Sequence, residues 1–131
     1  MVSIGEASRR SGVTVETIRY YERAGVVGRP RRAANGRRVY SEDEVAELRF
    51  LKRCRNLGFS LADARALLRL SRAQVRDCDA ARATAERHLT RIRTRMAELR
   101  RLEAALTELS ANCAEGRADC PLLDSLRDAP G

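Results

Sequence analysis

The sequence predicts a mainly α-helical protein, with a winged helix-turn-helix at its start, one long helix and a C-terminal loop. Three observations favour this fold class. The 131 residues are 44% hydrophobic but include no tryptophan and only five aromatic residues, which suits helices packed through small and aliphatic side chains. Two short helix signals lie in the first 25 residues, and no glycine or proline interrupts residues 78–112. The length fits about one domain.

The net charge is concentrated near the N-terminus. The chain has 26 basic and 18 acidic residues, a net charge of +8, and the first 40 residues contribute +6 of it through nine arginines and three glutamates. A local excess of arginine indicates a polyanionic partner, with nucleic acid as the first candidate. A solvated basic surface is the alternative, but it gives no reason for this segregation.

Several classes of protein are disfavoured by the composition. The start of the chain has no apolar signal core, and no later stretch approaches the roughly 18 apolar residues of a membrane span, so we expect a cytoplasmic protein with no membrane partner. In that compartment four cysteines are more typical of thiols or metal ligands than of disulfides. One histidine, no Gly-rich phosphate loop and no HExxH pattern argue against an enzyme.

The first 24 residues carry a helix-turn-helix pattern. Ser3 and Glu6 form a capping-box signature for a helix that ends before Gly12. Thr14 is a suitable N-cap for a second helix over residues 15–24. Its long polar side chains predict a recognition helix, although an ordinary helical hairpin would give the same pattern.

Residues 26–40 lack helical periodicity and predict a small wing. Asn35 and Gly36 suggest a two-stranded hairpin with a type I′ turn, in which both residues adopt positive φ. Guanidinium groups bind phosphate oxygens well, so the wing is expected to grip a nucleic-acid backbone beside the recognition helix. The arginines that flank the turn are Arg31, Arg32, Arg37 and Arg38.

Two further helices are predicted to complete the N-terminal domain. A capping box at residues 41–44 opens one that reaches about Asn56, and Ser60 caps the next after a break at Gly58. Cys54 falls on the apolar side of the first, so we expect a buried structural thiol. The predicted inward positions are Val45, Leu48, Leu51 and Leu57, then Leu61, Ala64, Leu67 and Leu68.

The long helix carries a coiled-coil seam. Apolar residues recur three or four positions apart, at 85, 89, 92, 96, 99, 102, 106 and 109. A domain of about 70 residues is too small to cover this stripe, which favours pairing with a second copy; folding over its own domain is the alternative. We therefore expect three parts: a DNA-binding domain at 1–70, a linker and dimerisation helix at 71–112, and a metal-binding loop with a short helix at 113–131.

Three cysteines could meet in an antiparallel dimer. Cys113 and Cys120 flank a six-residue loop, a spacing that also permits a disulfide or idle thiols. Cys78 lies roughly 50 Å from Cys113 along one helix, but antiparallel pairing about Met96 brings it beside Cys113 of the second chain. This predicts two equivalent sites per dimer, each with Cys113 and Cys120 of one chain and Cys78 of the other. Three thiolates favour Hg(II), Cd(II), Pb(II) or Zn(II).

These segments together resemble the MerR family of metal-responsive transcription regulators. The resemblance rests on IGEASRRSGVTVETIRYYERAGVV, on NGRRVYSEDEVAELRFLKRCRNLGFSL, and on the long helix with its Cys-x6-Cys-Pro loop. It implies a homodimer with an antiparallel coiled coil that binds a palindromic promoter. It also implies repression without metal, and activation when bound metal distorts the DNA so that RNA polymerase can engage both promoter elements.

The resemblance also assigns roles to individual residues. Cys78 matches a position that is cysteine in divalent-metal sensors of the family and serine in its Cu(I), Ag(I) and Au(I) sensors. The short loop is closer to cadmium and lead sensors, so Cd(II) or Pb(II) is favoured, Hg(II) is a rival and Zn(II) is less favoured. A Cys113–Cys120 disulfide switch and a Cu(I)/Ag(I)-type sensor are the alternatives. The matched positions are Thr14, Val15, Arg19, Tyr20 and Tyr21 of the recognition segment, Arg37, Arg38 and Tyr40 of the wing, Arg55 near phosphates, and Cys113 and Cys120 of the metal loop.

Overall fold

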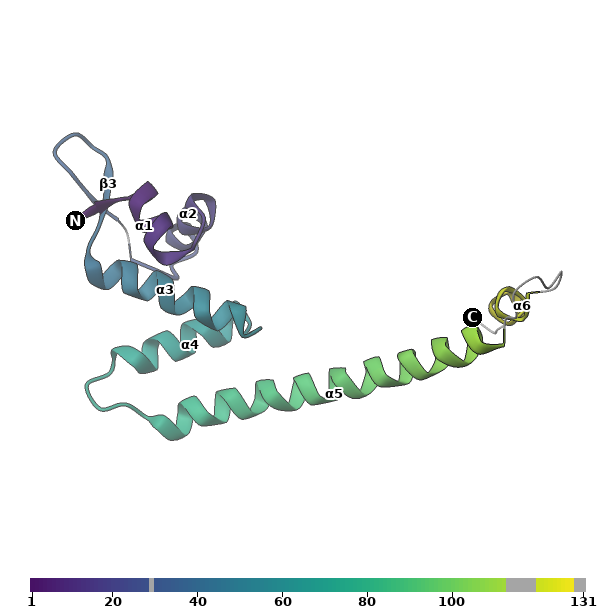
Figure 1. Cartoon of the computed structure of the whole chain (residues 1–131). Helices are drawn as coiled ribbons and strands as arrows, with labels where there is room; N and C mark the ends of the chain where they lie inside the picture. The colour runs from purple at the N-terminus through teal and green to yellow at the C-terminus, as the bar shows by residue number, and fades with distance from the viewer. Residues whose placement is uncertain (29, 113–119, 129–131) are drawn as a thin grey trace. The chain divides into compact units, whose positions relative to one another are not determined.

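The computed structural model describes residues 1–28, 30–112 and 120–128 (Figure 1). The chain divides into two compact units, Met1–Ala85 and Glu86–Gly131, and one long helix contributes to both. The first two turns of that helix therefore belong to the N-terminal unit. The elements are β1 Val2–Ser3, α1 Ile4–Ser11, α2 Val15–Arg23, β2 Arg31–Arg32, β3 Arg38–Tyr40, α3 Glu42–Asn56, α4 Leu61–Arg72, α5 Cys78–Ala111 and α6 Pro121–Asp128.

The predicted helix-turn-helix is confirmed by α1 and α2. The Ser3 hydroxyl accepts a hydrogen bond from the Glu6 backbone amide at 3.2 Å, and α1 ends at Gly12, whose φ of 80° is left-handed. The Glu6 carboxylate pairs with Arg9, so the reciprocal half of the expected capping box is replaced by an ion pair. The Thr14 hydroxyl caps α2 as predicted, accepting from the Thr17 amide at 3.2 Å.

The wing is a three-stranded antiparallel sheet in the order β1–β3–β2, not the two-stranded hairpin that we expected. Val2 pairs with Tyr40, and Arg31 pairs with Val39 on the other side of β3. A two-residue strand is too short to show an alternating pattern, so sequence reasoning missed β1. Its consequence is that the start of the chain is tied to the wing.

The type I′ prediction for the wing turn is wrong. Only Gly36 adopts positive φ, at 81°, and Asn35 does not. The Gly36 amide donates to the Ala33 carbonyl at 2.8 Å, while the Asn35 side-chain oxygen accepts from the Arg37 amide at 3.1 Å. This side-chain bond closes the turn with Asn35 at negative φ, so a β-turn followed by one left-handed glycine replaces the type I′ geometry.

The core of the N-terminal unit lies where α1 and α4 pack against α3. Both hydrogen bonds of the predicted capping box are present at the start of α3. Cys54 is buried as expected, and this burial raises the pKa of its thiol. Leu57 was expected to face inward but is 67% exposed, because it follows the last turn of α3 and leaves the helical register. The fully buried side chains include Ile18, Tyr40, Val45, Leu48 and Leu51.

The long helix α5 is continuous, and its apolar stripe is exposed in the single chain. Met96, near its middle, is 46% exposed. Pro121 takes the first position of α6, as its fixed φ favours. Among the described residues, no helix is both long enough and apolar enough to cross a membrane. The other exposed stripe residues are Leu89, Ile92, Leu99, Leu102 and Leu106.

Candidate nucleic-acid interface and cysteine positions

The exposed side of α2 carries the polar residues expected of a recognition helix. Arg19 is exposed and has no protein partner among the described residues, while Tyr20 is 50% exposed. Ile18, on the opposite side, is completely buried. The helix is therefore fixed by its apolar face and presents its cation to solvent, where a phosphate or a base edge can reach it.

The other predicted residues of this segment lie deeper. Thr14 is exposed but its hydroxyl caps α2, and Val15 is half-buried. Tyr21 is buried, which raises the pKa of its phenol, although the nearby charge of Arg55 opposes the shift. The structure thus brings Thr14, Arg19 and Tyr20 to the surface and places Tyr21 in the core.

The wing presents a second group of cations. Arg31, Arg32 and Arg37 are all exposed around the turn. The Arg32 guanidinium donates to the Gly36 carbonyl at 2.8 Å, and this hydrogen bond connects β2 to the turn. Arg37 has no side-chain partner in the described part of the chain, so its full charge is available to a phosphate backbone.

Arg38 and Tyr40, also predicted from the wing, face the protein instead. Both contact Glu22 at the end of α2, whose side chain is only 7% exposed. The Arg38 Nε atom lies 3.1 Å from a Glu22 carboxylate oxygen, and the Tyr40 hydroxyl donates to the other oxygen. Burial, followed by this hydrogen bond, raises the pKa of Tyr40. The group fixes β3 to α2, so these residues set the angle between wing and recognition helix.

Sequence reasoning missed Glu22, although one signal was available. It is one of three acidic residues among nine arginines in the first 40 positions, and its neighbours suggested only a polar helix face. Its partners Arg38 and Tyr40 lie 16 and 18 positions away, beyond any local periodicity.

Replacing Glu22 by glutamine should destabilise the N-terminal unit by about 1.5–3 kcal/mol, because Arg38 loses its charged partner in a half-buried position. Equilibrium denaturation of the two proteins measures this loss. The matched control is Glu16→Gln, since Glu16 is exposed on the same helix and should change stability by less than about 0.5 kcal/mol. Equal effects of the two substitutions would contradict a structural role for Glu22.

Arg55, which is predicted to lie near phosphates, is exposed at the end of α3. Its Nη1 atom donates to the Phe59 carbonyl at 2.6 Å, across the turn between α3 and α4. This bond holds the guanidinium close to the start of α4 and leaves its remaining N–H groups for another acceptor.

The cysteines occupy different settings. Cys78 is exposed and is the first residue of α5, where the Asp77 carboxylate accepts from the Ala80 amide at 2.9 Å. Cys120 is half-exposed and directly precedes α6, and its carbonyl accepts from the Asp124 amide at 3.0 Å. Cys113 lies outside the described residues. Among those described in one chain, no three His, Cys, Asp or Glu side chains are close enough together to hold a metal ion.

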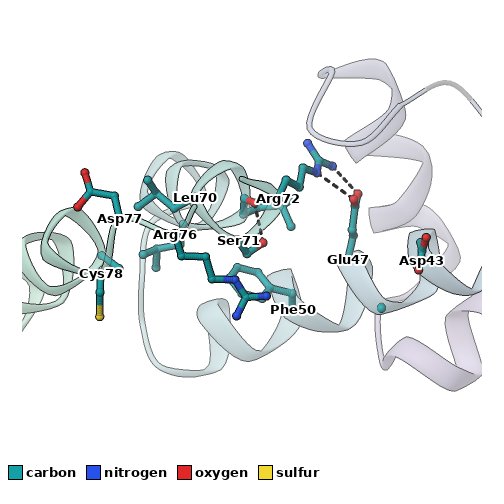
Figure 2. A pocket seen from close by; sticks show the side chains of 13 residues that line it. Asp43, Glu47, Phe50, Leu70, Ser71, Arg72, Arg76, Asp77 and Cys78 are labelled. Carbon is teal, nitrogen blue, oxygen red and sulfur yellow. Dashed lines mark hydrogen bonds and ion pairs between the residues drawn. The ribbon is translucent and has the colours of Figure 1, made fainter. Parts of the chain in front are cut away.

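A hollow of about 750 Å³ adjoins Cys78 within the N-terminal unit (Figure 2). Phe50 and Leu67 give it apolar walls, and Arg76 and Cys78 lie along its α5 side. Glu47 and Arg72 form an ion pair at its edge. Residues of α3 and the start of α5 therefore line the same hollow.

The fold and these sites match known proteins over most of the chain. Residues 2–71 match the family described as "MerR HTH family regulatory protein", and residues 45–109 match "MerR, DNA binding". The chain belongs to the MerR family. It is a helix-turn-helix, DNA-binding transcriptional regulator and not an enzyme, as the sequence predicts.

This MerR-family chain has several similar relatives. It is 44% identical to the HTH-type transcriptional regulator HmrR of Rhizobium leguminosarum bv. viciae, with 97% of this chain and 98% of the relative aligned. It is 40% identical to a mercuric resistance operon regulatory protein of Pseudomonas fluorescens, with 96% and 88% aligned. Among solved structures, PbrR691 from Ralstonia metallidurans CH34 in complex with lead(II) has a TM-score of 0.82 at 34% identity, covering 96% of this chain and 99% of that one.

Proposed function

We propose that this regulator binds a palindromic promoter as a homodimer and responds to a thiophilic divalent metal ion. Without metal it represses transcription. When metal binds, it distorts the promoter DNA so that RNA polymerase can engage both promoter elements. The observation that carries the proposal is the exposed Cys78 at the start of a continuous 34-residue helix whose apolar stripe is uncovered in one chain.

The geometry of α5 supports an antiparallel dimer. A helix of 34 residues is about 50 Å long, so the Cys78 and Ala111 ends of one helix cannot share a ligand. Antiparallel pairing through the exposed stripe places the start of each α5 beside the end of the other. Each metal site would then contain Cys113 and Cys120 of one chain and Cys78 of the partner subunit.

The donor chemistry supports a soft metal. Three thiolates select thiophilic ions over oxygen-loving ones such as Mg(II). Cys78 is exposed at the start of α5, and Cys120 directly precedes α6, so both thiols are accessible to a metal ion. One similar protein was solved with lead(II), and another is named for mercuric resistance. We therefore propose Cd(II), Pb(II) or Hg(II) as the effector, with Zn(II) less favoured.

The experiment that tests this function is a metal titration of reduced protein, followed through thiolate-to-metal absorption, together with transcription from the neighbouring promoter. We expect tight binding of two ions per dimer and transcription that rises with metal. Cys78→Ser should weaken metal binding at least tenfold. Removing a residue that binds the metal directly should cost at least as much affinity as removing a residue that only orients such a ligand. Unchanged affinity would exclude the three-cysteine site, and a response to oxidant instead of metal would favour a Cys113–Cys120 disulfide switch.

DNA recognition by α2 gives a separate prediction. Arg19→Ala should weaken promoter binding about tenfold at low salt, because one charge-assisted contact is lost. If the contact is to phosphate, the slope of log affinity against log salt should fall by about 0.9, and the loss should shrink as salt rises. Binding isotherms at several salt concentrations measure both quantities. Arg69→Ala is the control, since Arg69 is an exposed arginine on α4; a slope that changes equally in both variants would contradict the assignment.

A further inference from the structure

One bidentate ion pair joins two helices of the N-terminal unit at the edge of the hollow that Cys78 also lines. Glu47 lies in the middle of α3, and Arg72 is the last residue of α4. The Arg72 Nε atom donates to one Glu47 oxygen at 2.8 Å, and its Nη2 atom donates to the other (Figure 2). Two parallel hydrogen bonds between a guanidinium and a carboxylate fix both the distance between the two groups and their relative orientation. A single hydrogen bond fixes only the distance.

The position of this pair follows from the chain order. Arg72 ends α4, and Cys78 begins α5 six residues later. Between Cys78 and α3 lies the hollow of about 750 Å³. In the single chain the start of α5 adjoins this hollow. Residues 73–77 connect the start of α5 to the end of α4, which the ion pair holds against α3.

The first half of α4 contacts the turn after the recognition helix α2. The Arg65 guanidinium donates to the Gly25 carbonyl at 3.2 Å, and Gly25 follows α2 by two residues. Helix α4 is thus bonded to the turn after α2 through Arg65 and to α3 through Arg72. A small rotation of α4 changes both contacts, because a helix moves as a rigid element.

We propose that Glu47 and Arg72 are positioning residues that couple occupation of the Cys78 site to the orientation of the DNA-binding helices. The inference rests on the proposed function, in which Cys78 is a metal ligand. Neither Glu47 nor Arg72 is among the proposed metal ligands or the predicted DNA-binding residues. The pair transmits a displacement at the start of α5 to α3 and, through α4, to the turn after α2.

The pair is suited to coupling more than to stability. Its side chains are 27% and 45% exposed, and ion pairs at such positions contribute little to folding. Breaking the pair should leave the N-terminal unit folded. It should change how strongly metal binding at Cys78 alters the orientation of the DNA-binding helices. Typical coupling between two sites changes affinity 5- to 150-fold, which sets the scale of the expected loss.

The test compares Glu47→Gln, Arg72→Gln and the charge-swapped double variant Glu47→Arg/Arg72→Glu in the full-length protein. For each we measure Cd(II) affinity by thiolate absorption, promoter affinity without metal, and the fold increase in transcription on adding Cd(II). We expect both single variants to keep the two affinities within about twofold and to lose at least fivefold of the metal-dependent increase. The charge swap should recover most of that increase.

A second bidentate pair provides the matched control. Arg10 on α1 binds both carboxylate oxygens of Glu42 at the start of α3, and neither residue lines the hollow. Glu42→Gln should leave the metal-dependent increase within about twofold of the original. Full induction in the Glu47 and Arg72 variants, equal loss in Glu42→Gln, or single-variant loss without recovery in the charge swap would each overturn the inference. An original protein that ignores Cd(II), Pb(II) and Hg(II) alike would refute the proposed function instead.

Discussion

Mixing a Cys78→Ser chain with a Cys113→Ser/Cys120→Ser chain is expected to restore one complete metal site in each heterodimer. Neither variant can form a three-thiolate site as a homodimer. In the heterodimer, the first chain supplies Cys113 and Cys120, and the partner subunit's Cys78 completes the site. The opposite site has no cysteine, so the expected stoichiometry is one ion per heterodimer at the affinity of the original protein.

The measurement requires purified heterodimers, which two different affinity tags on the chains provide. Thiolate-to-metal absorption then gives affinity and stoichiometry for the heterodimer and for both parent homodimers. We expect the homodimers to bind at least tenfold more weakly. If ligation occurs within one chain, the heterodimer will bind no more tightly than its parents, and the antiparallel arrangement of the sites will be wrong.

Met96→Glu should dissociate the dimer and reduce promoter affinity by about 100-fold or more. Met96 lies at the centre of the exposed stripe of α5, so antiparallel pairing places the two copies of this position near each other. Two carboxylates would then be brought together in an apolar seam, which costs both desolvation and repulsion. A dimer contacts both halves of the promoter at once, which typically raises affinity 10²–10⁴-fold. Separated chains lack this increase.

Analytical ultracentrifugation and promoter binding measure this effect, and Thr94→Glu is the control. Thr94 is exposed two positions before Met96, on the opposite face of the same helix, so it introduces the same charge away from the seam. We expect Thr94→Glu to remain dimeric with nearly unchanged promoter affinity. A Met96→Glu protein that stays dimeric would show that another surface joins the chains.

The helices were predictable because the groups that begin and end them are neighbours in the sequence. Ser3, Thr14, Ser41 and Ser60 each accept a hydrogen bond from an amide three residues later. Gly12 ends α1 because its left-handed φ is costly for any residue with a Cβ atom. These interactions span three or four residues, so a local pattern contains all the information they need.

The errors and omissions have the opposite origin. Strand β1 exists because Val2 and Ser3 pair with Tyr40 and Val39, nearly forty residues away. Leu57 fits the apolar spacing of α3 but lies beyond its last turn, where that spacing no longer decides which side faces the core. The packing of Tyr40, a residue predicted for the DNA interface, is also non-local: it is only 2% exposed and bonds to Glu22 at the end of α2.

The sequence by itself determined the order of the helices, the basic N-terminal segment and the spacing of the cysteines, because each depends on residue types at short separations. Only the tertiary structure decided which arginines reach solvent and which are bound by Glu22 or Glu47. Those two carboxylates meet their partners 16 to 25 positions along the chain. Contacts at that separation depend on how helices and strands pack, and packing is set by the whole core and not by any local pattern.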